Sequence, residues 1–278
     1  DGDYLATRVS YKLNLNGPSL DIQSACSSAM ASIVLGIQSL LAYQSDMVLA
    51  GGVSVQYPEK VGYLYAPGGL DSADGVCRPF DKQANGTFFC RGCGVLLLKR
   101  LDEAIRDKDQ IYAVIRSGAL NNDGNKKVGF TAPSVEGQKE VICEALELAG
   151  VSAEDITMVE AHGTATPVGD PIEVTSLSES FRYYTNKKQY CALGSVKSNI
   201  GHTDAASGVI AVIKTALALK YKKIPASIHY SEPNPKIDFE NSPFFVNTRL
   251  SEWHPDRSRK RMALVNSFGV GGTNACVI

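Results

Sequence analysis

The sequence predicts an α/β fold in which strands and helices alternate along the chain. Short runs rich in Val, Ile and Leu are separated by segments whose apolar residues recur at helical spacing. Some runs are apolar almost without interruption, as expected for strands whose sheet is covered on both faces. The predicted strands are residues 19–24, 46–53, 94–99, 111–117, 156–161, 190–195, 244–248 and 261–267.

Helices are predicted between these strands from apolar stripes and from their end signals. One helix follows Cys26, and a second covers residues 134–149 and stops at Gly150. Asp170 is read as the capping residue of a third, with a proline in its first turn. The remaining predicted segments are a fourth helix at residues 204–219, a turn at 121–125 and a proline-rich surface loop at 231–243.

Composition and charge exclude several classes of function. Hydrophobic residues make up 44% and charged residues 21% of the 278 positions, which is enough for a sizeable core. The formal net charge is −1 and no face-wide run of Lys or Arg appears, so nucleic acid and anionic membranes are poor candidates as partners. No apolar stretch is long enough to cross a bilayer, and the acidic start is unlike a signal peptide. We expect a cytoplasmic protein.

The seven cysteines are an odd number and are scattered through apolar or glycine-rich segments. This pattern favours reduced thiols in a cytosol over a disulfide framework. Cys90 and Cys93 form one C-x-x-C pair, with no second pair and no histidine nearby. We interpret them as small buried residues in a packed strand and expect no metal site.

Cys26 is the candidate nucleophile because of its place in the segment SLDIQSACSSAM. A predicted strand ends at Ser24, the chain turns sharply, and a helix begins at Cys26 or just after it, as in a nucleophile elbow. The dipole and free N–H groups of a helix start favour the thiolate and can hold an oxyanion. Taken alone, a cysteine among small residues is more often buried filler.

Two histidines follow predicted strands in equivalent places. One strand runs into His162 in EAHGTATPVGDPIE, and another leads to His202 in KSNIGHTDAASG. Enzymes with α/β folds collect their chemistry at this end of the strands, although a lone histidine there is usually structural. His229 and His254 receive no role.

The glycine-rich segment SFGVGGTNA follows the last predicted strand. Its glycines let the backbone approach a ligand closely, and an N–H near Phe268 could supply an oxyanion donor. The segment could equally be a tight connection or a phosphate cradle of low specificity.

These motifs together resemble a known family. ACSS, EAHGTATPVGDPIE, KSNIGHTDAASG and NSFGVGGTNA occur in the order and spacing of the β-ketoacyl synthases of type I polyketide synthases. NNDG…KVGFTAPSVEGQ is similar to the bacterial modular members, and the resemblance covers essentially the whole chain. It implies a single ketosynthase domain with a thiolase-like fold of two similar α/β halves, layered α-β-α-β-α. Residues 1–110 would then be an incomplete N-terminal half with the nucleophile, because family members carry a long segment before this point, and residues 111–278 the C-terminal half with both histidines.

The resemblance implies a Cys-His-His site for a decarboxylative Claisen condensation. Cys26 would take an acyl chain from the phosphopantetheine of an acyl carrier protein. His162 and His202 would stabilise the enolate that forms when a malonyl-type extender loses carbon dioxide. The tetrahedral oxyanion would rest on the N–H groups of Cys26 and Phe268. No bound cofactor and no metal are expected.

Further residues receive supporting roles by the same resemblance. Lys197 and Glu173 would form a charged pair, while Thr164, Thr166 and Asn274 would contact the phosphopantetheine arm. A surface salt bridge and loop-capping hydroxyls remain the alternatives for these residues. The expected partners are an acyl carrier protein, an acyltransferase domain and a second copy of the chain, paired through residues 19–24.

Two other functions compete with this interpretation. A non-elongating synthase domain would hold and pass acyl chains without condensing them, but such domains usually lack one active-site histidine. A cysteine hydrolase with a Cys-His pair would not need both histidine motifs. Departures from the family pattern include Cys90 and Arg91, where smaller residues are more usual, and Ala165 in place of a glycine.

Overall fold

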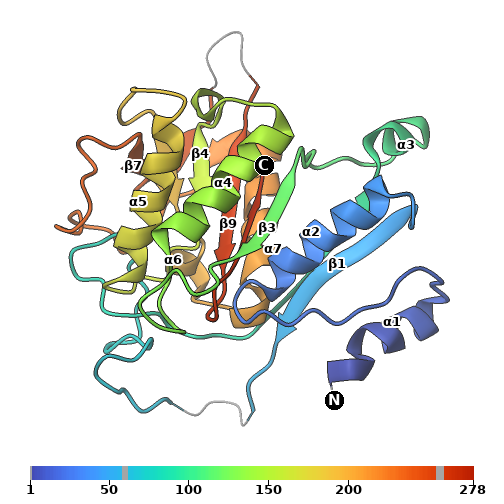
Figure 1. The fold of residues 1–278 in the computed structure, drawn as a ribbon, viewed down its shortest axis with the longest axis horizontal. Coiled ribbons are helices and arrows are strands. Elements are labelled where there is room, and N and C mark those ends of the chain that lie inside the picture. Colours follow the sequence, from blue (N-terminus) through green and yellow to red (C-terminus); the bar gives the residue numbers. More distant parts are fainter. Residues whose placement is uncertain (1, 58–61, 255–259) are drawn as a thin grey trace.

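A six-stranded mixed sheet forms the centre of the protein (Figure 1). The computed structural model describes residues 2–57, 62–254 and 260–278. The strand order is β3-β10-β9-β4-β5-β7. β4 pairs in parallel with β5 and β9, β7 extends the parallel set beside β5, and β10 runs antiparallel between β9 and β3. The bounds are β3 Gly118–Asn122, β4 Met158–Glu160, β5 Cys191–Gly194, β7 Phe244–Val246, β9 Ala263–Phe268 and β10 Thr273–Val277.

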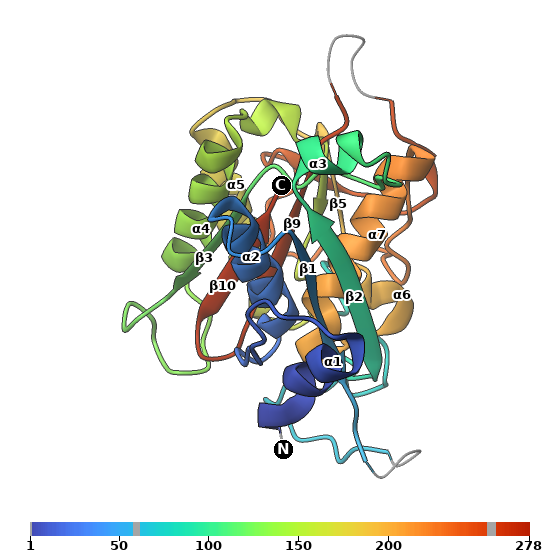
Figure 2. The ribbon, with the colours of Figure 1, turned by 90° about the vertical axis from the view of Figure 1, so that its right-hand side faces the viewer.

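Helices cover both faces of this sheet (Figures 1 and 2). α4 (Val135–Ala149) and α5 (Gly169–Arg182) pack on one face, and α2 (Ser28–Leu41) and α7 (Ser207–Tyr221) on the other. The far side of α2 and α7 carries an antiparallel pair of strands, β1 (Met47–Ser54) and β2 (Gly92–Lys99). The described residues therefore form four layers in the order α-β-α-β.

Apolar side chains fill the space on both sides of the central sheet. Ile142, Leu177 and Phe244 lie in the core beneath α4 and α5, and Met30 and Val209 lie in the core beneath α2 and α7. These five side chains are fully buried. Both cores are needed to hold the loops at the ends of the strands in place.

Short elements complete the fold. α1 lies apart from the layers in Figure 1 and has no buried residue. β6 and β8 form a small antiparallel sheet of their own. The bounds are α1 Leu5–Leu13, α3 Leu101–Arg106, α6 Lys197–Ile200, β6 Lys223–Ile224 and β8 Ser251–Glu252, with 3-10 turns at Gly2–Tyr4, Ala153–Asp155 and Asp204–Ala206.

Most predicted helices and strands are confirmed. Six of the eight predicted strands are present with ends that shift by at most two residues. The second helix has the predicted ends, because the Ser134 hydroxyl accepts the N–H of Gly137 and Gly150 adopts a left-handed φ of 62°. The division into residues 1–110 and 111–278 stays a prediction.

Two predicted strands are wrong. Residues 19–24 form no ladder with any described segment, and their one bridge is the local contact of Ser24 with Cys26. Residues 111–117 are not a strand either, because pairing in this segment begins only where Arg116 and Ser117 reach the carbonyl of Ile278. A segment becomes a strand only beside a partner. Among the described residues, 19–24 has no neighbouring strand and 111–117 reaches only Ile278 at its last two residues.

The predicted cap and turn also need correction. Asp170 does not cap α5, which begins at Gly169; the Asp170 carboxylate is buried and accepts the N–H groups of Phe80 and Ala165. The predicted turn at 121–125 begins only at Asp123, because its first two residues belong to β3.

Burial differs from the prediction at two places. The loop at 231–243 has no regular structure, as predicted, but it is not only a surface loop because Ile237 and Phe239 are buried in the core. Cys93 is exposed rather than buried, because its side chain lies on the open face of β2.

Candidate active site

Cys26 lies in a sharp turn that leads into α2. Ala25 adopts a φ of 52°, a conformation that residues with a Cβ atom adopt only when the surroundings enforce it. The hydroxyl of Ser207, at the start of α7, donates to the Cys26 carbonyl at 3.0 Å. The hydroxyl of Ser267, in β9, donates to the same carbonyl at 3.1 Å. A helix and a strand far along the chain thus hold the turn in place.

The environment of the Cys26 sulfur corrects one prediction. The side chain is 6% exposed, and its sulfur lies 3.7 Å from a carboxylate oxygen of Asp204. Burial, and then the negative charge of Asp204, raise the pKa of Cys26 to about 11, although Lys197 and the N–H of Val270 act in the opposite direction. The resting sulfur is therefore a thiol, and the expectation that the helix start favours a thiolate is wrong.

The two candidate histidines lie next to each other. The His162 ring meets the His202 ring edge-on, with ring centroids 5.5 Å apart. His162 follows β4 directly, as predicted, whereas α6 intervenes between β5 and His202. Phe89 stacks on the His202 ring at 5.0 Å, and Phe268 lies 5.8 Å from the His162 ring. Aromatic rings thus enclose the pair.

Hydrogen bonds and burial fix the protonation of these rings. The backbone N–H of Asp204 donates to Nδ1 of His202 at 3.0 Å, so the proton of the neutral His202 ring sits on Nε2. Burial, together with the positive charge of Lys197, lowers the pKa of both His162 and His202 well below the ordinary value. Both rings are neutral at physiological pH, and His202 offers an N–H donor from Nε2.

Lys197 and Glu173 position His162 through its backbone. The Glu173 carboxylate accepts the N–H groups of His162 and Gly163 at 2.8 Å each. The Lys197 ammonium donates to the carbonyl of His162. In the described part of the chain these two buried charges form no ion pair with each other, so the predicted pair is wrong in its direct form. Glu173 accepts the N–H and Lys197 binds the carbonyl of the same peptide group, the one between His162 and Gly163.

The predicted pantetheine contacts have local partners. The Thr166 hydroxyl accepts the N–H of Gly169 at 3.1 Å and lies 3.2 Å from the Thr164 hydroxyl, which fits the loop-capping alternative. Asn274 is 2% exposed, and its amide donates to the side chains of Asn121 and Asp123. Asn274 therefore joins β10 to β3, and its side chain is not presented to a ligand.

Two residues near the sulfur were missed by the sequence analysis. Asp204 adopts a left-handed φ of 47°, which turns its side chain toward Cys26. The N–H that reaches the sulfur belongs to Val270, two residues beyond the predicted donor Phe268. Both residues stand within the quoted motifs, but no feature of the sequence shows where their backbones point.

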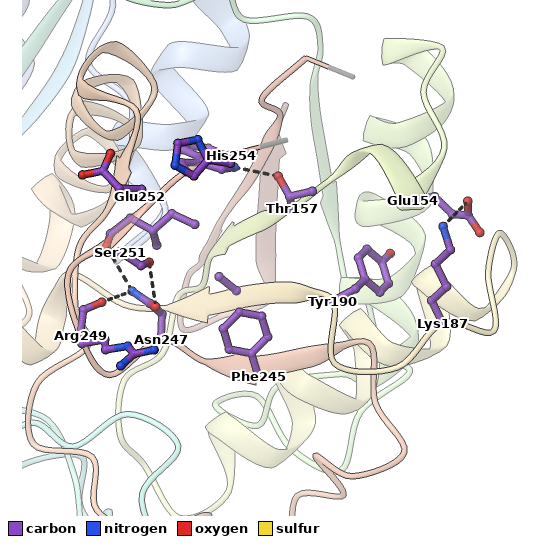
Figure 3. A pocket seen from close by; sticks show the side chains of 13 residues that line it. Glu154, Thr157, Lys187, Tyr190, Phe245, Asn247, Arg249, Ser251, Glu252 and His254 are labelled. Atoms are coloured by element: carbon purple, nitrogen blue, oxygen red, sulfur yellow. Dashed lines mark hydrogen bonds and ion pairs between the residues drawn. The ribbon is translucent and has the colours of Figure 1, made fainter. Parts of the chain in front are cut away.

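A separate pocket of about 580 Å³ lies at the edge of the sheet near β5 and β7 (Figure 3). Its walls include Tyr190, Phe245 and Arg249, and it contains none of the candidate site residues. The described residues contain no group of three or more His, Cys, Asp or Glu that could hold a metal ion, and all seven cysteines are free thiols. Within the same ranges, no helix has the length and apolar character needed to cross a membrane.

Comparison with known families agrees with this site and fold. The family profile of the β-ketoacyl synthase N-terminal domain matches residues 1–104, and that of the C-terminal domain matches residues 112–231. The chain therefore belongs to the β-ketoacyl synthase family, whose ketosynthases are acyltransferase-type enzymes of polyketide synthases.

Individual relatives are polyketide synthases of bacteria. The chain is 48% identical over its whole length to one component of the phenolphthiocerol/phthiocerol polyketide synthase of Mycobacterium tuberculosis, of which it covers 19%. It is 44% identical over 98% of its length to polyketide synthase PksL of Bacillus subtilis, of which it covers 6%.

Solved structures of ketosynthases confirm the predicted thiolase-like α/β fold. Ketosynthase twelve of the bacillaene synthase of Bacillus amyloliquefaciens matches with a TM-score of 0.97 and 41% identity. The ketosynthase from module 6 of the bacillaene synthase of Bacillus subtilis matches with a TM-score of 0.93 and 42% identity. Each match covers the whole chain, and the chain spans about half the length of these solved structures, 49% and 50%.

Proposed function

We propose that this chain carries out a decarboxylative Claisen condensation, in which an acyl chain on Cys26 is extended by a malonyl-type unit. One observation carries the proposal: two buried, neutral histidine rings lie in edge-to-face contact, and Asp204, whose N–H binds the His202 ring, also contacts the Cys26 sulfur. Neutral N–H donors in a buried site stabilise a developing oxyanion without the cost of burying a cation.

In the first step, Cys26 takes the acyl chain from a carrier-bound thioester. The Cys26 sulfur loses its proton and attacks the thioester carbon, and N–H groups at the turn stabilise the tetrahedral oxyanion. Collapse of this intermediate breaks the bond to the pantetheine sulfur, which takes up a proton and leaves as a free thiol. The resemblance assigns these N–H donors to Cys26 and Phe268. The N–H of Val270, which reaches the sulfur, is a further candidate in the same turn.

In the second step, the histidines hold the carbonyl oxygen of the malonyl thioester. Loss of carbon dioxide leaves an enolate, and the N–H at Nε2 of His202 donates to its oxygen together with His162. The enolate carbon then attacks the Cys26 thioester, and collapse of the tetrahedral intermediate breaks the bond to sulfur. Cys26 leaves as a thiolate, which takes up a proton from solvent and returns to the thiol. Glu173 and Lys197 keep His162 in place through its peptide groups.

Several partners follow from this chemistry. Both acyl groups would arrive on the phosphopantetheine arm of an acyl carrier protein, and an acyltransferase domain would load the extender. A second copy of the chain, paired through residues 19–24, and a cytoplasmic location belong to the same proposal. The relatives named above are modular synthases, which supports a carrier protein as the source of the substrates.

The test separates acylation from decarboxylation. Cys26→Ala should accept no acyl group from a hexanoyl thioester in intact-mass measurements. His202→Ala should still be acylated but should release carbon dioxide from malonyl-carrier protein about 10²–10³-fold more slowly. His254→Ala is the control, because His254 is an exposed histidine outside the site.

Two outcomes would contradict the proposal. If His202→Ala released carbon dioxide at the wild-type rate, the role of His202 would be wrong. A wild-type protein that is acylated on Cys26 but releases no carbon dioxide would instead support the non-elongating alternative.

A further inference from the structure

The hydrogen bond from Asp204 does not by itself fix the orientation of the His202 ring. At 3.0 Å, this bond determines which edge of the imidazole faces the Asp204 peptide. It leaves the tilt of the ring plane free, because a single hydrogen bond at Nδ1 acts as a pivot. In the proposed function the N–H at Nε2 has to point at one oxygen atom, so the ring plane has to be held by a second contact.

The segment Phe88–Cys90 lies along His202 and binds its backbone on both sides. The His202 N–H donates to the carbonyl of Phe88 at 2.7 Å, and the Cys90 N–H donates to the carbonyl of His202 at 2.9 Å. These two bonds form an isolated parallel bridge that pairs Phe89 with His202. Residues paired in this way project their side chains to the same side, so the bridge brings the Phe89 ring beside the imidazole.

Gly201 allows the two segments to approach this closely. A Cβ atom at this position would lie 2.8 Å from the carbonyl oxygen of Phe88, and Gly201 adopts a φ of 83°. Glycine is the residue that fits both conditions. The bridge therefore depends on backbone atoms and on Gly201, and it does not depend on the side chain of Phe89.

The Phe89 ring stacks on the His202 ring. The ring centroids are 5.0 Å apart and the planes differ by 23°, an arrangement that aromatic pairs favour. His202 is 1% exposed, whereas Phe89 is only half-buried, so Phe89 is not a core side chain enclosed on all sides. The ring near His162 is arranged differently, because Phe268 lies tilted to it by 56°. Among these contacts, the Phe89 stacking is the one that can fix a ring plane.

We propose that Phe89 is a positioning residue that fixes the plane of the His202 ring, so that the N–H at Nε2 points at the enolate oxygen. The role rests on the proposed function. Asp204 sets the tautomer of His202 through its N–H, and Phe89 sets the tilt of the ring by stacking. Phe89 touches no reacting atom and acts only through His202. Acylation of Cys26, which does not use His202, is independent of Phe89.

Two substitutions separate the aromatic ring from the rest of the side chain. Phe89→Leu removes the stacking surface and keeps an apolar side chain, while Phe89→Tyr keeps the ring. Both variants retain the backbone bridge to His202. Phe245→Leu is the matched control, because Phe245 is a partly exposed phenylalanine of β7 in the separate pocket, which contains none of the candidate site residues.

Two rates measured on the intact protein should respond differently. Phe89→Leu should release carbon dioxide from malonyl-carrier protein with a kcat about tenfold below that of the wild type and with an unchanged KM. Its Cys26 should be acylated by the hexanoyl thioester of N-acetylcysteamine at the wild-type rate, followed by intact mass. Phe89→Tyr and Phe245→Leu should match the wild type in both reactions.

Proton NMR reports the stacking independently of activity. The ring protons of His202 lie against the face of the Phe89 ring and should resonate upfield of those of His254, which is exposed. Loss of these signals in His202→Ala assigns them. Phe89→Leu should move the His202 signals downfield and Phe89→Tyr should not, a pattern that a general change in stability would not produce.

Three results would overturn the inference and leave the proposed function standing. If Phe89→Leu matched the wild type in kcat and in the His202 signals, stacking would not hold the ring. If KM rose while kcat stayed the same, Phe89 would contact the substrate. If acylation slowed as much as decarboxylation, Phe89 would act on the fold as a whole. A wild-type protein that is acylated on Cys26 but releases no carbon dioxide would instead overturn the proposed function, so the two failures are distinguishable.

Discussion

Gly208 allows α7 to lie directly against α2, and Gly208→Ala should separate the two helices. A Cβ atom at this position would lie 2.8 Å from the backbone nitrogen and from the Cβ of Met30. Both atoms belong to the turn of α2 that follows Cys26, and neither can rotate away. The preceding residue, Ser207, holds the Cys26 carbonyl, so a shift of α7 would also move the nucleophile.

Two opposing effects decide the size of the change. Alanine is the better helix former by about 1 kcal/mol, which favours the variant. A contact of 2.8 Å with backbone must open by several tenths of an ångström, and overpacking of this kind typically costs about 1–3 kcal/mol, occasionally more. Because the obstructing atoms are backbone, we place the steric cost at or above about 3 kcal/mol. The free energy of unfolding should therefore fall by about 2 kcal/mol.

Thermal and urea unfolding measure this loss. A decrease of about 2 kcal/mol should lower the Tm by about 4–8 °C in a domain of this size. Acylation of Cys26 should slow along with this loss of stability, whereas binding at surfaces far from α2 and α7 should not change. Gly62→Ala is the matched control, because no atom of the described residues lies within 4 Å of the position that its Cβ would occupy. If Gly208→Ala were as stable and as active as Gly62→Ala, the close contact between α2 and α7 would not limit this fold.

Two further predictions follow from exposure and charge. Limiting iodoacetamide at pH 7.5 should label Cys93 before Cys26, because Cys93 is exposed whereas Cys26 is a buried thiol with a raised pKa. Peptide mapping that finds Cys26 labelled first would contradict this prediction. Burial raises the pKa of Asp170 to about 7, so the folded state keeps a proton that the unfolded chain loses near pH 4. The free energy of unfolding should therefore fall by at most about 4 kcal/mol as the pH rises from 4 to 7. In urea unfolding, Asp170→Asn should flatten the dependence of the free energy of unfolding on pH, and the control Asp102→Asn should leave it unchanged. Equal pH dependences for the wild type and both variants would refute the raised pKa of Asp170.

Periodicity and end signals were sufficient for most of the fold. The helix that became α4 was predicted over residues 134–149 with its stop at Gly150, and the structure starts it one residue later because Ser134 is its cap. Residues 19–24 alternate polar and apolar side chains and residues 111–117 are largely apolar, as true strands do. Their structure depends on whether a partner lies beside them, and composition carries no information about pairing.

The site was predicted in its parts but not in its electrostatics. The motifs located Cys26, His162 and His202, and the fold brings them to the ends of α2, β4 and α6. The protonation of the sulfur depends on Asp204, and the direction of that side chain depends on a left-handed backbone within a helical-looking segment. A helix start alone suggested a thiolate, but burial and a neighbouring carboxylate outweigh the helix dipole.

Burial explains why Cys26, His162 and His202 rest in their neutral forms. A cation on either histidine or an anion on Cys26 would lose its hydration, and few protein groups are arranged to replace it. Lys197 and Glu173 are buried beside the histidines, and their heads are bound to the peptide groups of His162. Asp204 is the carboxylate at the sulfur that keeps access to solvent. Charge therefore needs to appear only as bonds form, and the left-handed backbones of Ala25 and Asp204 place the thiol beside the Asp204 carboxylate.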